Sequence, residues 1–435
     1  MWARKRIDIN TCDMMVALGY CVRPYPRQRS LENISRCFDS TQTVVCLSVR
    51  SGFDLLLQTT AWSAGSEVIF SGLTIGDMPR IAREHELKVV GVDVDWKTLA
   101  PSVDEIESKI TSRTRAIVTA HLMGGRNDLA KIGELARRHN LMLIEDCAQS
   151  YVGNQHHGSP QADVSMFSFG SIKTNTALGG AVIVVREPDL KSTMQENHAS
   201  WPFQSRFSYP SRIFKYGIVK TISTWPIAAL IRIGFRVRGR NHDSMAAGLA
   251  KGFAGPEFFK RIRHQPSDAL LSMLSRQIKR FDPSKLAYRK SRGDDFTSTI
   301  LSRNGDLLPI GSQSEISTHW VFAVPVANPG ELTQHLWDLG FDATTHSSLK
   351  AVHSDEVHGD STQIKYVRQG LPNAEKILRH IVFLPIDFPM PKREIERLGD
   401  AVARIGVPIG DFDPCPLDRP SYQITAGVNR PRTVA

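Results

Sequence analysis

The sequence predicts an α/β fold in which a mostly parallel sheet is covered by helices on both faces. Three observations favour this fold. The chain has 435 residues, of which 41% are hydrophobic and 23% charged, enough for one large domain and a smaller one. Between residues 41 and 190, short apolar segments alternate with amphipathic ones. The apolar segments have the length of buried strands, and the amphipathic ones carry apolar residues at helical spacing.

The large domain, residues 41–190, is predicted to alternate strand and helix along most of its length. Strands are expected at residues 43–47, 67–70, 88–94, 115–121, 141–146, 164–169 and 179–185. Helices are expected at residues 51–64, 77–87, 102–110 and 128–140. The first helix is predicted to begin at the Ser51-Gly52 pair, directly after a strand.

A smaller α+β domain is predicted for residues 266–410. It begins with a helix over residues 267–281, for which Ser267 is the expected N-cap. Further strands are expected at residues 319–326 and 380–386, and further helices at residues 329–340 and 391–405. The remaining segments are predicted to be an N-terminal arm (1–40), a basic and apolar insertion or linker (191–265) and a tail (411–435).

The charge and the cysteines restrict the class of protein. The net charge of +10 favours an anionic partner, but no nucleic-acid-binding motif accompanies it, so no nucleic acid is expected. The six cysteines form no CxxC pair and no metal-ligand spacing with histidines. This pattern predicts reduced thiols in a cytoplasmic protein without a bound metal. No secretory signal is expected, and no apolar run is long enough to span a bilayer.

Candidate functional groups fall where predicted strands end. They are the Ser51-Gly52 pair, His121, Asp146 and, after the next strand, Lys173. In such sheets, ligands collect beyond the carboxyl ends of the strands. Lysine is costly to bury, so Lys173 in a turn followed by Gly179-Gly180 indicates a loop built around its amine. The alternative is an ordinary surface lysine.

These residue types meet the needs of pyridoxal 5'-phosphate chemistry. A lysine amine forms an imine with the cofactor's carbonyl, and a carboxylate keeps the pyridine nitrogen protonated. Lys173 and Asp146 are the candidates for these two roles. Ser51 and Gly52, at a helix N-terminus, and the hydroxyl of Ser168 are the candidates for holding the phosphate.

Four segments resemble the DegT/StrS family of pyridoxal-phosphate sugar aminotransferases. The segments IEDCAQSYVG and FSFGSIKTNTALGGAVIV are similar to the family's Glu-Asp-x-Ala-Gln and Ser-Phe-x-x-x-Lys segments. The segments RSGFDLLL and AHLMGG are similar to its Ser-Gly-Thr turn and Val-His-x-x-Gly strand end. The resemblance covers residues 45–190 well. It implies the type I aminotransferase fold, with a mostly parallel seven-stranded sheet in the large domain and a smaller C-terminal α+β domain.

The resemblance also implies a homodimeric aminotransferase that takes an amino group from glutamate to a keto substrate, such as a nucleotide-linked keto sugar. Lys173 would be the Schiff-base lysine and the proton carrier, and Asp146 would pair with the pyridinium nitrogen. Gln149 would hydrogen-bond the ring's phenolic oxygen, and His121 would neighbour the ring or the substrate. The phosphate would be held by Ser168, Ser51 and Gly52.

Several positions depart from the family's pattern. Phe53 stands where the family has a threonine, Ile75 where an aromatic residue stacks on the ring, and Leu178 where a glutamate precedes Gly-Gly. The nearest match to the family's Asn-x-Arg segment, which a neighbouring subunit contributes, is RIRHQPSD around Arg263. Two alternatives therefore stay open: a non-catalytic or regulatory protein of this fold, and another pyridoxal-phosphate reaction on an amino acid.

Residues 212–240 combine dense apolar side chains with lysines and arginines and contain no acidic residue. Such a segment is a candidate for peripheral contact with an anionic membrane surface. Lys220 and Arg232 interrupt it and Pro226 would kink a helix, which argues against a membrane-spanning segment. The alternative is a helical insertion packed on the protein's own core or on a dimer partner.

Overall fold

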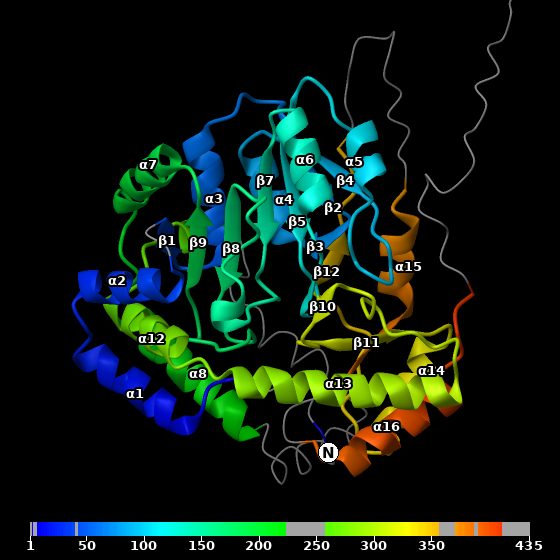
Figure 1. The fold of residues 1–435 in the computed structure, drawn as a ribbon. Helices are drawn as coiled ribbons and strands as arrows, with labels where there is room; N and C mark the ends of the chain where they lie inside the picture. The colour runs from blue at the N-terminus through cyan, green and yellow to red at the C-terminus, as the bar shows by residue number, and fades with distance from the viewer. Residues whose placement is uncertain are drawn as a thin grey trace, which may run out of the picture.

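A seven-stranded sheet forms the centre of the molecule (Figure 1). The computed structural model describes residue 2 and residues 7–39, 42–222, 257–355, 370–386 and 390–410. In spatial order the strands are β1 (Thr43–Cys46), β9 (Ala181–Val185), β8 (Val164–Ser168), β7 (Met142–Asp146), β5 (Thr114–Ala120), β2 (Glu67–Ser71) and β4 (Lys88–Val92). Only β9 runs antiparallel to its neighbours in this sheet. The predicted mostly parallel, seven-stranded sheet is confirmed.

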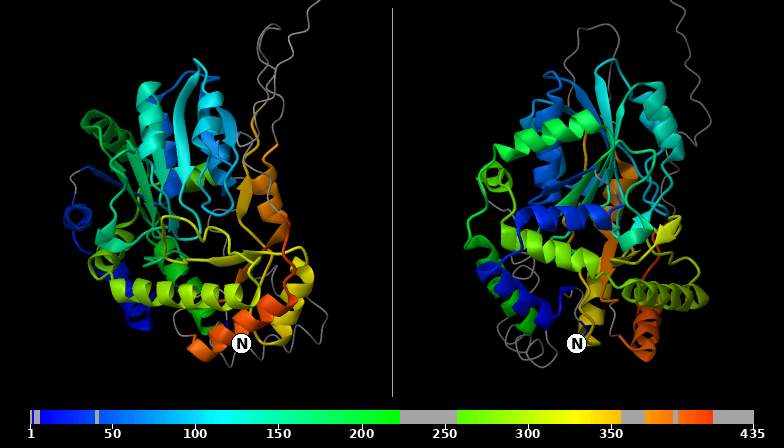
Figure 2. Two further views of the ribbon diagram at one scale, coloured as in Figure 1. Left: turned by 45° about the vertical axis from the view of Figure 1, so that its right-hand side comes forward. Right: turned by 60° about the vertical axis from the view of Figure 1, so that its left-hand side comes forward.

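Helices cover both faces of the sheet, as the turned views in Figure 2 show. One face packs against α3 (Val49–Thr60), α4 (Asp77–Glu84) and α7 (Pro188–Ala199), and part of the other against α5 (Val103–Ser108) and α6 (Ala130–Arg138). Alternate residues of β2 pack into the hydrophobic cores on opposite faces of the sheet. Val68 and Phe70 lie in the core beneath α3 and α4, whereas Ile69 lies in the core beneath α6. This alternation follows from the two-residue period of a strand.

The N-terminal region, predicted as an arm, contains two helices that enter the core. They are α1 (Thr11–Val22) and α2 (Arg27–Cys37), and both pack on α12 (Asp268–Lys279). Ile34 of α2 and Leu274 of α12 are fully buried in one cluster with Val182 of β9. Ser267 caps α12 by accepting a hydrogen bond from the Leu270 N–H at 3.4 Å, so the predicted N-cap is confirmed.

The C-terminal part contains a long helix, α13 (Pro283–Arg303), and an antiparallel pair, β11 (Phe322–Pro325) with β13 (Ile381–Leu384). Helices α14 (Pro329–Asp338), α15 (Pro372–His380) and α16 (Lys392–Ile405) complete it. Two short pairings join it to the large domain: β10 (Ile316–Ser317) with β6 (Gly125–Arg126), and β12 (Leu349–Ala351) with β3 (Leu73–Ile75). These pairings bring the loop before β11 to the carboxyl edge of the large sheet.

The first helix of the large domain begins earlier than predicted. Helix α3 starts at Val49, and Ser48 is its N-cap, accepting a hydrogen bond from the Ser51 N–H at 3.1 Å. The prediction that the helix begins at Ser51-Gly52 is therefore wrong by two residues. It failed because Val49 continues the apolar pattern of the strand, whereas the serine that caps the helix stands before it.

The segment between the two domains includes α8 (Ser208–Ile222) and α11 (Phe258–Ile262). Within the large domain, a short turn of 3-10 helix, η1 (Gly153–Gln155), follows β7. Residues 223–240 of the candidate membrane segment, and the tail 411–435, lie outside the described residues. Within the described ranges, no helix combines the length and the apolar character needed to cross a bilayer.

Candidate active site

The predicted site residues converge because their strands end at one edge of the sheet. The strand register places Ala120 opposite Asp146, so His121 follows β5 beside the end of β7. On the other side, Ser168 lies opposite Ala181 of β9, which in turn lies opposite Cys46 at the end of β1. Helix α3 begins shortly after that residue. The carboxylate, the hydroxyl and the helix N-terminus therefore share the carboxyl edge of the sheet.

Asp146 is a buried carboxylate at this edge, with a residual exposure of 7%. Its Oδ1 accepts a hydrogen bond from the Ala148 N–H at 2.9 Å. Burial raises the pKa of Asp146 above its usual value, although the hydrogen bond and the charges of Lys173, His121 and Arg50 act in the opposite direction. Desolvation of this kind favours a cationic partner close to the carboxylate.

The preceding residue, Glu145, points to a different set of donors and fixes the end of β7. His121 Nε2 and His156 Nε2 donate to its Oε1 at 2.9 and 3.0 Å. The Ser159 N–H and the Ser165 hydroxyl donate to its Oε2 at 2.8 and 2.6 Å. Burial raises the pKa of Glu145, but the two histidines outweigh it and hold the pKa well below its usual range. His121 is thus oriented by Glu145, its neighbour across the β5–β7 pair.

Sulfur, nitrogen and oxygen atoms of Cys147, His121 and Glu145 lie within 4.8 Å of one another. Such residue types can bind a metal ion. Here, however, protein donors already occupy both carboxylate oxygens of Glu145, and the charge of Arg126 interacts with Glu145 and Cys147. We therefore assign this cluster to the anchoring of β7.

Lys173 lies in the turn between β8 and β9, and the turn is held by backbone contacts. The Phe169 carbonyl accepts hydrogen bonds from the N–H groups of Ala177 and Gly179 and from the Thr176 hydroxyl. The Gly179-Gly180 pair has a packing role: an added Cβ would lie 2.4 Å from Arg212 Nη1 at Gly179 and 2.9 Å from Leu274 Cδ2 at Gly180. The close approach predicted for this pair is therefore made by α8 and α12.

Two residues of the C-terminal part reach this turn, and no sequence pattern predicts them. The ring of Trp320 lies beneath the amine of Lys173, with 4.5 Å from Nζ to the ring centroid. The indole N–H of Trp320 donates to the Ile172 carbonyl at 3.2 Å. Arg289 of α13 donates to the Thr318 carbonyl and to the Thr174 hydroxyl. Because these residues lie more than 100 positions after Lys173, no local spacing could have indicated them.

Gln149 and Ser168 lie on the same edge with polar atoms partly engaged. Gln149 Oε1 accepts a hydrogen bond from the Met123 N–H at 2.9 Å, which fixes the side chain. Among the described residues, Ser168 Oγ accepts a single hydrogen bond, and that one is long, 3.4 Å, from the Gly170 N–H. The other expected phosphate ligands are engaged inside the protein. Ser51 is fully buried with its hydroxyl 2.9 Å from that of Ser48, and a Cβ at Gly52 would meet Ile183.

The residues present fit pyridoxal phosphate. Within the described part of the chain, no hydrogen bond reaches Oδ2 of Asp146, and none is made by Nε2 of Gln149. A pyridinium N–H and a phenolic oxygen are matching partners for these two atoms. Phe53, which replaces the family's threonine, is fully buried in the core, so this position offers no hydroxyl to a phosphate. Ile75 packs between the core of the large domain and that of the C-terminal part.

Arg263, the nearest match to the partner-subunit segment, makes a contact within its own chain. Its guanidinium donates to both carboxylate oxygens of Asp54 at 2.8 and 3.0 Å, and His85 Nε2 lies 3.0 Å from Asp54 Oδ1. Asp54 is fully buried. Burial raises its pKa, but the hydrogen bonds from His85 and Arg263 outweigh this, so the pKa is held below its usual value.

Replacing Arg263 by alanine is expected to lower the free energy of unfolding by about 1–3 kcal/mol, because it leaves a buried carboxylate with fewer donors. The loss is expected in full above the unfolded pKa of an aspartate, about 3.9, and to shrink as the pH falls through the lower folded pKa. Denaturant unfolding at neutral and acidic pH measures it. Lys260→Ala removes an exposed ion pair in α11, the helix that ends just before Arg263; it is the control and should change stability by less than about 0.5 kcal/mol.

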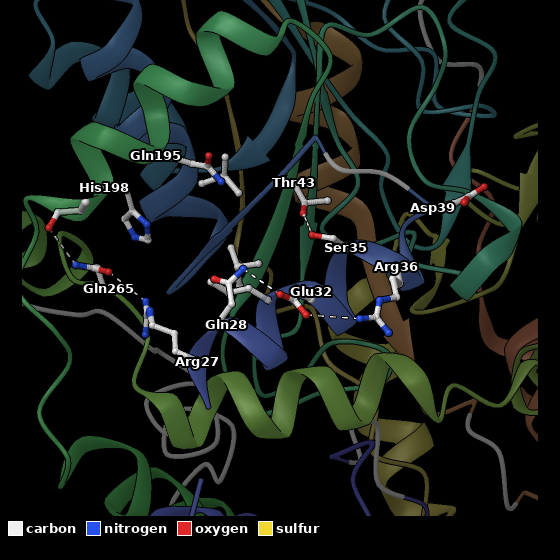
Figure 3. Close-up of a pocket in the computed structure, with 14 residues that line it drawn as sticks. Arg27, Gln28, Glu32, Ser35, Arg36, Asp39, Thr43, Gln195, His198 and Gln265 are labelled. Atoms are coloured by element: carbon white, nitrogen blue, oxygen red, sulfur yellow. Dashed lines mark hydrogen bonds and ion pairs between the residues drawn. The ribbon is translucent and has the colours of Figure 1, made fainter. Parts of the chain in front are cut away.

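A separate cavity of about 940 Å³ lies between α2, the edge of β1 and α7 (Figure 3). His198 lines it and is nearly buried, with Nε2 unpaired among the described residues. Burial, and then the charge of Arg27, lower the pKa of His198 to about 4. In Figure 3, Arg27 is hydrogen-bonded to Gln265 on the same side of the cavity. None of the predicted site residues lines this cavity.

Residues 8–207 match the model of the DegT/DnrJ/EryC1/StrS aminotransferase family. The chain is 38% identical over 144 residues to the GDP-perosamine synthase of Escherichia coli O157:H7. This matched segment covers 31% of this chain and 38% of that protein. It is 35% identical over 169 residues to a UDP-N-acetyl-3-dehydro-alpha-D-glucosamine 3-aminotransferase of Acidithiobacillus ferrooxidans, covering 36% and 44%. The chain thus spans less than half the length of these two relatives.

Solved structures resemble almost the whole chain. The aminotransferase TlmJ of Streptoalloteichus hindustanus superposes with a TM-score of 0.67 at 19% identity, over 93% of this chain and 98% of that one. A putative sugar aminotransferase of Streptococcus pneumoniae, in its PLP form, gives 0.65 at 16% identity over the same shares. The aminotransferase fold expected from the resemblance is confirmed. Over residues 8–207, this chain is similar to the DegT/DnrJ/EryC1/StrS aminotransferase family.

Proposed function

We propose that this protein is a pyridoxal-phosphate-dependent aminotransferase that moves an amino group from glutamate to a sugar ketone. The observation that carries the proposal is the meeting of Lys173, Asp146 and Gln149 at one edge of the sheet. The positive charge of Lys173 lowers the pKa of the buried Asp146 carboxylate, against the effect of burial. One oxygen of that carboxylate receives no hydrogen bond from the described residues.

Each residue has a role that its surroundings support. Bound pyridoxal phosphate supplies an electron sink for the substrate's carbon. The Asp146 carboxylate holds a proton at the pyridine nitrogen, since a buried carboxylate favours a cationic neighbour. Gln149, fixed through its Oε1, offers Nε2 to the phenolic oxygen. The Lys173 amine would bind the cofactor's carbonyl, and once the substrate's amine had displaced it from there, the freed amine would remove and return the proton at the substrate carbon.

The binding site for the cofactor's phosphate would lie at the same carboxyl edge of the sheet, where β8 and β1 end. We assign it to the hydroxyl of Ser168 and to the first turn of α3, which contains Ser51 and Gly52. Ser168 is the stronger candidate, because within the described ranges its Oγ makes only one long hydrogen bond. The Ser51 hydroxyl is instead paired with Ser48. The helix N-terminus adds a favourable field for an anion.

The sugar ketone is supported by what the relatives are named for. Besides the two sugar enzymes above, a segment is 33% identical over 159 residues to an L-glutamine:2-deoxy-scyllo-inosose aminotransferase of Streptomyces fradiae, covering 36% of this chain and 37% of that protein. By name, the first makes GDP-perosamine, the second is an aminotransferase of UDP-N-acetyl-3-dehydro-alpha-D-glucosamine, and the third is an aminotransferase of 2-deoxy-scyllo-inosose. The net charge of +10 suits a substrate that carries phosphate.

The absorption spectrum of the purified protein tests the function. The expected result is a near-visible band of bound pyridoxal phosphate that shifts when glutamate is added. A band that no amino donor shifts would point to another pyridoxal-phosphate reaction. The absence of a band after incubation with the cofactor would point to a non-catalytic protein, and either result would overturn the proposal.

We further propose that the enzyme is a homodimer, as the family resemblance implies. Light scattering at micromolar concentration is expected to give about twice the chain mass of 48.5 kDa. In such a dimer Arg263 would not reach the neighbouring site, because its guanidinium donates to Asp54 of its own chain. A monomer in this measurement would contradict the proposal.

We place the enzyme in the cytoplasm. The described cysteines are all free thiols, and four of them, Cys21, Cys37, Cys46 and Cys147, have a pKa raised by burial. Thiols that stay protonated are slow to oxidise. Such thiols suit a reducing compartment.

A further inference from the structure

Exposed apolar side chains are concentrated in one region of the molecule. Of the ten large hydrophobic residues that are exposed in the described part of the chain, seven come from residues 15–25 and 203–218. We call these seven the α1–α8 surface: Met15, Val22, Tyr25, Phe203, Phe207, Phe214 and Ile218. Isolated exposed hydrophobic residues are ordinary, whereas a gathering of this kind marks a surface that binds something.

Helix α8 has two apolar sides. Its inner side carries the buried residues Tyr209, Ile213 and Tyr216. Phe207, just before the helix, and Phe214 and Ile218 within it are each at least 60% exposed. Their spacings of seven and four residues place them along one stripe if the helical path is continued to Phe207. The inner side satisfies the packing of the helix on the protein. The outer stripe therefore needs a separate explanation.

Helix α1 repeats this arrangement beside α8. Met14 faces α8, where a Cβ at Gly217 would lie 3.4 Å from its Cε. Met15 and Val22, seven residues apart, are 64% and 89% exposed. The two helices are in contact, and Figures 1 and 2 show them together at the end of the molecule below α2 and α12. The exposed apolar residues of both helices therefore belong to one end of the molecule.

The chain around this surface is basic and lacks acidic residues. Neither residues 14–31 nor residues 198–222 contain an aspartate or glutamate. Together they contain seven cationic residues: Arg23, Arg27, Arg29, Arg206, Arg212, Lys215 and Lys220. Lys220 donates to the Ile9 carbonyl, so this contact leaves its charge in place. Arg212 instead points inward, where its guanidinium donates to the Leu178 carbonyl beside Gly179. Arg27 is paired with Asp268.

The charge distinguishes between two partners for such a surface. A symmetric dimer would place the surface against a copy of itself, with cations facing cations and no acid within residues 14–31 or 198–222 to pair with them. An anionic lipid bilayer instead offers phosphates to the cations and an apolar boundary to the phenylalanines. We propose that the α1–α8 surface binds reversibly to the face of an anionic membrane. The surface is formed by described residues alone, and the acid-free sequence continues beyond them to residue 242.

Flotation of the full chain with vesicles tests this proposal. The vesicles are phosphatidylcholine alone, or phosphatidylcholine mixed with phosphatidylglycerol, at low and moderate salt. The protein is expected to float with the anionic vesicles, to stay at the bottom with the neutral ones, and to float less as salt is added. Equal flotation with both compositions, or none with anionic vesicles at low salt, overturns the proposal.

Matched variants show whether this surface is responsible. Phe214→Glu with Ile218→Glu is expected to lower the floated fraction at least about tenfold, because it removes two apolar side chains and adds two negative charges. Leu301→Glu with Val407→Glu changes exposed hydrophobic residues elsewhere and should float as the unchanged protein does. Flotation of the first variant at the unchanged level would overturn the assignment. So would its conversion from dimer to monomer in light scattering, because the surface would then be a subunit interface. The cofactor band of both variants reports that the fold is intact.

Discussion

Replacement of Lys173 by alanine is expected to abolish transamination and the near-visible band of the bound cofactor. The methyl side chain of alanine has no amine, so the variant can neither bond to the cofactor's carbonyl nor move the proton. The fold should survive, because the turn is held by other atoms: the Phe169 carbonyl accepts three hydrogen bonds and the Trp320 indole donates to Ile172. Circular dichroism and the unfolding midpoint check this.

Two further variants separate the amine from the charge. Lys173→Arg retains a cation that can lie over the Trp320 ring, but it is a poor nucleophile, so it should also be inactive. Lys97→Ala removes a lysine that likewise lies over a tryptophan, 5.7 Å from the Trp96 ring centroid, and should leave activity unchanged. Ordinary turnover in the Lys173→Ala protein would show that another residue is the nucleophile.

The sheet could be predicted because each strand is encoded locally. Segments such as LMLIED and GGAVIVV are apolar over a strand's length, and β7 and β9 form within them. The carboxyl edge then follows from the parallel direction of the strands, so Asp146, Ser168 and the start of α3 could be placed together before any contact was known. The predicted start of α3 was wrong because the only local signal for it was a single capping serine, Ser48.

The rest of the site depends on long-range packing that leaves no local pattern. Trp320 reaches Lys173, and Arg289 reaches the neighbouring Thr174, only because β10 pairs with β6 and α13 crosses beneath the large domain. The Glu145 network joins residues from three strands and from the turn that follows β7. Gly179 and Gly180 illustrate the same limit. Their sequence indicated a close approach, but only the fold reveals that Arg212 and Leu274 make it.

Replacement of Asp146 by asparagine is expected to keep the cofactor and lose most of the activity. An asparagine Oδ1 can still accept the Ala148 N–H, so the end of β7 should retain its shape. The amide, however, is neutral and cannot hold a proton on the pyridine nitrogen, so the ring loses its capacity to accept electrons. The rate is expected to fall on the order of a hundredfold or more, with the absorption band still present.

A second aspartate provides the control for this experiment. Asp163 Oδ2 accepts a hydrogen bond from the Leu143 N–H at 2.7 Å, near the other end of β7. Asp163→Asn retains an oxygen for that bond and changes the charge away from the site, so its activity should stay close to that of the unchanged protein. Equal rates for the Asp146→Asn protein and this control would mean that the Asp146 carboxylate only supports the strand end. The buried charge would then have no part in the reaction, and the assignment of the pyridine partner would have to be withdrawn.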